Sequence, residues 1–259
     1  MKYLIFIFIS CFTLTSVQQT SSIEKTLNDI NSTFKTMEVK LLHWPKDLQP
    51  KLGNLKKTAF IAFPKKGTID KLPLIITLHG AGGKKWTIEE QLKRSAKVKG
   101  LSLAELAGKD IILLEPNSSE NWDPKTLNVM LDYILKTYTQ IDQNRIYVMG
   151  HSMGGKGTWD WIQQSSERFA AAAPGGFSGV SEEDNFTKLA NFPVFGMVGG
   201  EDGKNVSSVK KMIDLLKAAG NKNVKYIAFP GANHSQGNKK LFSHVECVEW
   251  MLTFQIKNK

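Results

Sequence analysis

The chain has 259 residues, of which 41% are hydrophobic and 22% charged, and it carries a formal net charge of +10 at pH 7. This length suits one domain with a single large core, and the composition leaves no low-complexity tail or long linker. All but three of the 34 basic residues are lysines spread along the chain, which argues against a nucleic-acid partner and favours a solvated cationic surface.

The N-terminus has the three parts of a secretory signal peptide. A positively charged start is followed by an apolar run over residues 4–12 and then by small polar residues. Because the run is too short to span a bilayer, we expect residues 1–20 to be a cleaved signal peptide, the protein to be secreted or periplasmic, and no transmembrane segment to be present. The alternative is a lipid anchor at Cys11. The mature chain would keep only Cys247, in an apolar helical pattern, so we expect no intramolecular disulfide and a buried thiol.

Residues 21–36 are expected to form a mobile or loosely helical lead-in to one α/β domain over residues 37–259. Two strand-like runs, 37–42 and 58–63, are separated by turn residues and predict a hairpin. Short apolar strands then alternate with helical patterns. The predicted strands cover 72–78, 111–114, 145–149, 169–173, 193–198 and 224–229, and the helices 87–98, 127–138, 153–165, 206–219 and 241–254.

This alternation predicts a mostly parallel sheet with helices on both faces, because wholly apolar strands must be covered on each side. The stretch 175–193 is too short to hold a large cap domain. We therefore expect a site that is open to solvent.

Ser152 is the central candidate residue. It stands in Gly150-His151-Ser152-Met153-Gly154, between a predicted strand and a predicted helix. Glycines two positions away on either side let strand and helix approach closely, while the strained turn projects the serine hydroxyl. The pattern alone also fits an incidental serine in a glycine-rich turn, so its strand-turn-helix context carries the prediction of a nucleophile.

A serine hydroxyl needs a neighbouring imidazole to take its proton. Of the five histidines, His234 lies in a predicted loop after the last strand, at the sheet edge where Ser152 emerges. It is therefore the expected base. The others fit less well. His151 should point away from the site, and His79 should brace its loop. His244 should lie in the last helix, and His43 should precede the core of the sheet.

The residue that orients the base should follow the strand at 193–198. Two acids stand there, Glu201 and Asp202. Both are open, and we favour Asp202, which lies three residues after Gly199 and just before a predicted helix. The chain order is then serine, acid, histidine.

Acyl transfer also needs donors for the developing oxyanion. Two backbone N–H groups are candidates, those of Met153 at a helix start and Ala81 in the glycine-rich stretch 78–83. That stretch lacks the Gly-Lys-Ser/Thr ending of a phosphate-binding loop. Trp86 and Trp122 follow strand ends on the same side, where they either line a substrate groove or pack in the core or rim. No residue cluster has metal-ligand spacing, so we expect no metal or cofactor.

These motifs resemble a branch of the α/β-hydrolase superfamily. The branch includes predicted peptidases, phospholipase/carboxylesterase-like proteins, and polyhydroxybutyrate-depolymerase- and feruloyl-esterase-like enzymes. The resemblance rests on the run 141–159 with 168–174, and extends over roughly residues 55–255. It implies an α/β-hydrolase fold, a triad of Ser152, Asp202 and His234, and an oxyanion hole at Ala81 and Met153. The turn after Asp202 is one residue longer than the family pattern, which keeps Glu201 open.

The resemblance and the motifs together predict a secreted serine hydrolase that cleaves small-molecule or polymeric carboxylic esters through an acyl-enzyme. Residues 37–259 would then be the catalytic domain. Two alternatives remain: a serine peptidase of prolyl-oligopeptidase-like type, and a non-catalytic binding protein on a hydrolase scaffold.

Overall fold

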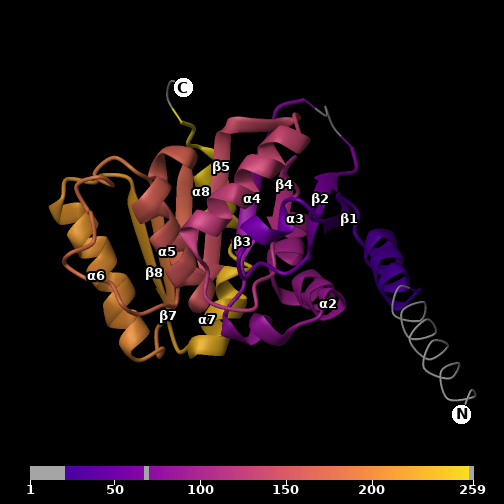
Figure 1. The fold of residues 1–259 in the computed structure, drawn as a ribbon. Helices are drawn as coiled ribbons and strands as arrows, with labels where there is room; N and C mark the ends of the chain where they lie inside the picture. Colours follow the sequence, from indigo (N-terminus) through magenta and orange to yellow (C-terminus); the bar gives the residue numbers. More distant parts are fainter. Residues whose placement is uncertain (1–20, 67–69, 257–259) are drawn as a thin grey trace, which may run out of the picture.

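The computed structural model describes residues 21–66 and 70–256 of the chain. The predicted signal peptide, with Cys11, lies outside these residues. Residues 21–33 form a helix at the β1 end of the molecule, so the predicted lead-in is helical over most of its length (Figure 1). Within the described residues, no helix is both long and apolar enough to cross a membrane.

One sheet of eight strands forms the centre of the domain, in the order β1-β2-β4-β3-β5-β6-β7-β8. The first two strands pair antiparallel, as the predicted hairpin requires, and β2 also pairs antiparallel with β4. All remaining pairs are parallel. The strands are β1 Met37–His43, β2 Thr58–Pro64, β3 Leu72–Leu78, β4 Ile112–Glu115, β5 Ile141–His151, β6 Ala171–Gly175, β7 Val194–Gly199 and β8 Val224–Phe229.

Helices cover both faces of the sheet, as predicted. One face packs against α4 Pro124–Thr137, α5 Met153–Ser165 and α6 Lys204–Ala218. The other packs against α2 Ile88–Val98, α3 Gly100–Ala107, α7 His234–Leu241 and α8 Val245–Leu252. All seven residues of β3 are buried, and alternate ones enter opposite cores. Residues 176–193 contain no helix or strand, in agreement with the absence of a large cap.

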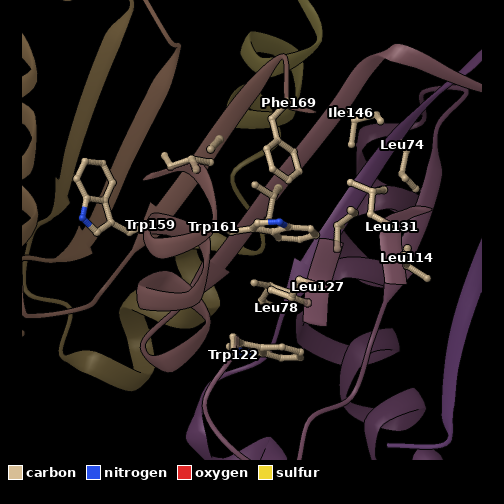
Figure 2. Packing of buried hydrophobic residues seen from close by; sticks show 14 of the residues in the cluster. Leu74, Leu78, Leu114, Trp122, Leu127, Leu131, Ile146, Trp159, Trp161 and Phe169 are labelled. Carbon is tan, nitrogen blue, oxygen red and sulfur yellow. The ribbon is translucent and has the colours of Figure 1, made fainter. Parts of the chain in front are cut away.

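Tryptophans fill much of the α4–α5 side of the core. Trp161 packs edge-on against Phe169, with ring centroids 4.8 Å apart, and Figure 2 shows this pair in the same cluster as Leu127 and Leu131. The Nε1 of Trp161 donates to Asn128 Oδ1 at 2.8 Å, so a buried indole N–H finds its partner on α4. This contact fixes α5 against its neighbouring helix.

Two parts of the helix prediction were wrong. The structure has two helices that were not predicted, α3 and α7, and the helix expected at 241–254 is shorter, since α8 spans only Val245–Leu252. Helix α7 is polar and buries only Gly237 and Leu241, so it has no apolar period to detect. Its signal was the capping box, in which Asn233 and Gln236 each accept a hydrogen bond from the other's backbone.

Glycines allow the start of α5 to approach the sheet closely. A Cβ on Gly154 would lie 2.0 Å from the Leu78 carbonyl oxygen of β3, and one on Gly155 would lie 2.1 Å from the Gly175 carbonyl oxygen of β6. Both obstructing atoms belong to backbone in the middle of the sheet, which cannot yield as a flexible side chain can. The start of the helix is therefore held between two strands.

Replacing Gly154 with alanine should lower the free energy of unfolding by about 2–3 kcal/mol, because the added methyl overlaps strand backbone. Urea unfolding followed by circular dichroism measures this. Gly82→Ala is the matched control, because a Cβ on Gly82 would meet only Trp86, at 3.9 Å. The free energy of unfolding of this variant should equal that of the wild type. Equal stability of the two variants would contradict the packing described for α5.

Candidate active site

Ser152 lies at the sharp turn between β5 and α5. Its φ of 62° and ψ of −124° make it one of two non-glycine residues with positive φ among those described. Its backbone N–H donates to the Gly175 carbonyl at 3.0 Å, and its carbonyl accepts from Lys156 N at 2.9 Å. The turn is thus strained but held on both sides, as is common for residues that carry function.

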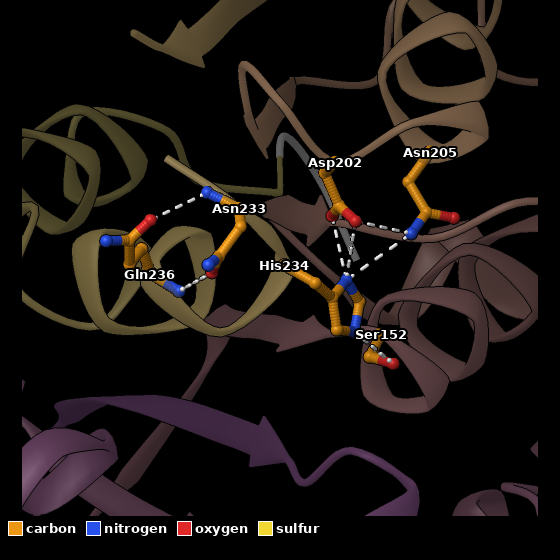
Figure 3. A network of polar contacts seen from close by, with 6 residues as sticks. All are labelled: Ser152, Asp202, Asn205, Asn233, His234 and Gln236. Atoms are coloured by element: carbon orange, nitrogen blue, oxygen red, sulfur yellow. Dashed lines mark hydrogen bonds and ion pairs between the residues drawn. The ribbon is translucent and has the colours of Figure 1, made fainter. Parts of the chain in front are cut away.

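The imidazole of His234 lies between Ser152 and Asp202 (Figure 3). Its Nε2 is 3.0 Å from the Ser152 Oγ, and its Nδ1 is 2.8 and 2.9 Å from the two Asp202 carboxylate oxygens. A carboxylate can only accept, so it holds the imidazole proton on Nδ1. The Nε2 lone pair then faces the serine hydroxyl, which is the geometry that proton abstraction requires.

The structure brings only one of the two candidate acids, Asp202, into contact with His234. The Asp202 side chain is 5% exposed and contacts His234, whereas Glu201 is exposed, with its backbone N–H donating to Ala232 O. The turns after β7 and β8 pack so tightly that a Cβ on Gly199 would lie 2.4 Å from that same Ala232 oxygen. This packing sets the position of Asp202 against the histidine.

Asn205 is a site residue that the sequence interpretation missed. Its Nδ2 donates to Asp202 Oδ1 at 3.0 Å and lies 3.3 Å from His234 Nδ1. It is the second residue of α6, within the stretch after Asp202 whose unusual length was the available signal. By donating to the carboxylate, Asn205 restricts the orientation that Asp202 can adopt toward the imidazole.

His234 is not in a loop, as was expected, but is the first residue of α7. The capping box formed by Asn233 and Gln236 fixes the start of this helix and so the direction of the imidazole (Figure 3).

His151 lies beside His234 and does not point away from the site, which corrects the sequence interpretation. Its ring centroid is 4.6 Å from that of His234, and the side chain is buried, with Nε2 lacking any hydrogen-bond partner among the described residues. Burial, followed by the charge of His234, lowers the pKa of His151 to about 3. The reason for its position is that α7 carries His234 over the side of β5 to which His151 points.

His79 braces the glycine-rich loop after β3, as expected. Its Nδ1 donates to the Gly80 carbonyl at 2.9 Å and its Nε2 accepts from Ser118 N at 3.0 Å. A Cβ on Gly83 would lie 2.2 Å from the ring, so the loop wraps closely around it. Burial lowers the pKa of His79 to about 4, which keeps the ring neutral under the loop.

The two candidate oxyanion donors both begin helical segments near the serine. Ala81 is the first residue of the 3₁₀ turn η2, Ala81–Lys85, and Met153 is the first residue of α5. The N–H of a first helical residue has no acceptor within its own helix. The backbone before Ala81 reaches the serine, because a Cβ on Gly80 would lie 3.4 Å from Ser152 Cβ. Both N–H groups thus belong to backbone next to the hydroxyl.

Two cavities meet at Ser152. One, of about 390 Å³, is lined by Trp122 and by the paired Lys156 and Asp160. The other, of about 460 Å³, is lined by Trp86 and by His234. Trp122 is 5% exposed and its Nε1 donates to the His79 carbonyl at 2.9 Å, so it packs in the rim while one edge reaches a cavity.

One cluster has ligand atoms close enough to suggest a metal site, although the sequence spacing gave no sign of one. Atoms of His151, Asp202 and His234 lie within 4.8 Å of one another. Both ring nitrogens of His234, however, already face Asp202 and the Ser152 hydroxyl. The cluster is therefore organised for moving a proton.

Comparisons with known proteins identify the family to which the chain belongs. The model of the dienelactone hydrolase family matches residues 114–246, slightly more than half of the chain. No curated protein is similar enough in sequence to count as a match.

Solved structures share the fold. A thermostable esterase aligns with a TM-score of 0.64 at 22% identity, over 85% of this chain and 63% of its own, so the chain spans less than two thirds of that protein. A ferulic acid esterase aligns with a TM-score of 0.59 at 16% identity, over 84% of this chain and 98% of its own. The acylaminoacyl peptidase of Pyrococcus horikoshii aligns with a TM-score of 0.58 at 16% identity, over 87% of this chain and 43% of its own. The predicted α/β-hydrolase fold is confirmed.

The buried histidines predict that the fold loses stability in acid. A histidine whose pKa falls from 6.5 to about 4 on folding has no effect on stability above pH 6.5, and destabilises the fold increasingly as pH drops toward 4. His79 should therefore account for roughly 3 kcal/mol of that loss, with a further part from His151. In His79→Gln, chemical unfolding at a series of pH values should show a shallower decline, while the exposed His43→Gln should follow the wild type.

Proposed function

Because the chain belongs to the dienelactone hydrolase family of α/β-hydrolases, we propose that it is a serine hydrolase that cleaves carboxylic esters. Ser152 is the nucleophile, His234 the base and Asp202 the acid that orients it. One observation carries this proposal: the Ser152 hydroxyl, both ring nitrogens of His234 and the Asp202 carboxylate form one continuous hydrogen-bonded path.

In the first half-reaction Ser152 Oγ attacks the ester carbonyl carbon, and its proton passes to His234 Nε2. The negative charge that develops on the carbonyl oxygen is stabilised by the backbone N–H groups of Ala81 and Met153, the second of which also adds the helix dipole of α5. When the C–O bond of the ester breaks, Nε2 returns the proton to the departing alcohol oxygen. An acyl group remains on Ser152.

In the second half-reaction a water molecule takes the place of the alcohol. His234 removes a proton from the water as it attacks the acyl carbon, and then protonates Ser152 Oγ as the acid leaves. Asp202 stays ionised throughout and stabilises the imidazolium formed in each half. Two cavities on either side of the hydroxyl leave room for an acyl group and an alcohol.

We also propose that residues 1–20 export the protein, on the basis of their charge and hydrophobic pattern. When the full chain is expressed in a secreting host, mass spectrometry of the exported protein should show that roughly the first 16 to 20 residues have been removed. A mature chain that begins with a lipid-modified Cys11 would replace this proposal with the lipid-anchored alternative.

Replacing Ser152 with alanine should lower turnover of an aryl ester by several orders of magnitude, because no nucleophile remains. Steady-state kinetics with p-nitrophenyl acetate measures it. A fluorophosphonate probe should label the wild-type protein and not the variant. Failure to label the wild type would favour a binding protein on this scaffold, and hydrolysis of a peptide anilide at a rate comparable with the ester would favour the peptidase alternative.

The two acids of the turn after β7 give a matched pair. Asp202→Asn removes the acceptor that keeps the His234 proton on Nδ1, and should lower kcat about 10⁴-fold, as loss of the orienting carboxylate does in other triads. Glu201→Gln changes the neighbouring exposed acid and should leave kcat within about twofold. A larger loss of kcat in Glu201→Gln than in Asp202→Asn would assign the orienting role to Glu201.

A further inference from the structure

A buried cation lies in the cavity of about 460 Å³ beside Ser152. Lys99, just after α2, is 8% exposed and lines this cavity. Its ammonium lies 5.6 Å from the ring centroid of Trp86 and 5.0 Å from that of Phe242, and donates to Asn238 Oδ1 at 3.4 Å. Lys99 has no ion pair with any carboxylate of the described residues. A charge this buried normally has one.

The nearest acid, Glu115, is engaged elsewhere. Its carboxylate accepts from Ser95 Oγ, and a Cβ on Gly100 would lie 2.2 Å from its Oε1, which places it beneath the junction of α2 and α3. Burial raises the pKa of Glu115 to about 7 and lowers that of Lys99 to about 8. Glu115 thus braces the junction, while Lys99 lines the cavity.

The rest of this cavity is also cationic. Arg94 and Lys239 line it together with Lys99, and its lining includes no aspartate or glutamate. The guanidinium of Arg94 lies 4.9 Å from the Trp86 ring centroid, which holds it at the cavity wall. The other cavity differs, because its Lys156 is paired with Asp160. Among the described residues, the cationic side chains that line the cavity beside Lys99 have no ion-pair partner, unlike Lys156 in the other cavity.

The position of His234 indicates which part of a substrate this cavity receives. His234 lines the cationic cavity and is absent from the lining of the other. In the proposed mechanism its Nε2 protonates the departing alcohol oxygen, so the alcohol must lie next to that ring. The cationic cavity is thus on the leaving-group side.

We propose that the cationic cavity, formed around Lys99, Arg94 and Lys239, binds an anionic group on the alcohol half of the ester. The preferred substrates are then esters of hydroxy acids or phenolic acids in which the free carboxylate belongs to the leaving group. This inference rests on the proposed esterase function. An incoming carboxylate would give the buried ammonium the charged acceptor that the folded chain does not supply.

A pair of near-isosteric esters tests the charge preference. 4-Acetoxybenzoate and 4-acetoxybenzamide have leaving groups of the same shape, and only the first is anionic. After division by the rate of hydroxide-catalysed hydrolysis of each ester, kcat/KM should be about tenfold or more higher for the carboxylate, and the ratio should decline as salt is added. If both esters are hydrolysed at a ratio near one, this inference fails while the esterase function stands. If Ser152→Ala leaves the hydrolysis of both unchanged, the proposed function itself fails.

Variants locate the source of the preference. Lys99→Gln should reduce the anion-to-amide ratio to near one. Because this buried substitution can impair folding, the exposed Arg94→Gln and Lys239→Gln are tested alongside it, and each should lower the ratio severalfold. Lys97→Gln removes the same charge from an exposed position on α2 outside the cavity, and should keep the wild-type ratio. A ratio lowered equally in Lys97→Gln would show a general effect of surface charge and overturn the assignment.

A second substrate pair tests which half of the ester, acyl or alcohol, occupies the cationic cavity. Mono-(4-nitrophenyl) succinate carries its carboxylate on the acyl half, and 4-nitrophenyl butyrate is its neutral partner. We expect no preference for the anion in this pair. A preference here that Lys99→Gln abolishes would place the acyl group in the cationic cavity and overturn the leaving-group assignment.

Discussion

The close approach of helix α5 to two central strands is the constraint on which the site depends. Gly154 and Gly155 place the helix start against backbone of β3 and β6, and the chain can enter that narrow space only through the left-handed turn at Ser152. The strain at the serine is thus a consequence of packing in the sheet. The same packing brings the first N–H of α5 next to the hydroxyl, so the proposed nucleophile and one proposed oxyanion donor share one structural cause.

The site separates its histidines by burial. His79 and His151 are buried and stay neutral, the first under the glycine-rich loop and the second against the ring of the base. His234 keeps 45% of its side-chain surface exposed, so a substrate can reach it. The neutral ring of His151 packs against His234 without adding a competing charge, and the deeply buried Asp202 carboxylate on the other side can balance an imidazolium.

Local patterns in the sequence predicted the sheet and the residues that meet at Ser152, because apolar strands and turn glycines leave clear signals. The misses have physical reasons. Helix α7 is too polar to show a period, and its start depends on side-chain caps. The stacking of His151 on His234 depends on which face of β5 the helix covers, which no local pattern records. The contact of Asp202 rather than Glu201 with His234 depends on packing between the turns after β7 and β8, which are distant in sequence. The contact of Asn205 with Asp202 lies in the same region.

Helix α7, which begins at His234, is one of the least buried segments of the domain. Its eight residues bury only Gly237 and Leu241, and its start is held by a pair of polar side chains. Segments with so few apolar contacts open at a smaller free-energy cost than the sheet they cover. Heat or denaturant would therefore detach the imidazole through local unfolding while the strands remain paired, and loss of turnover would precede the cooperative melting of the domain.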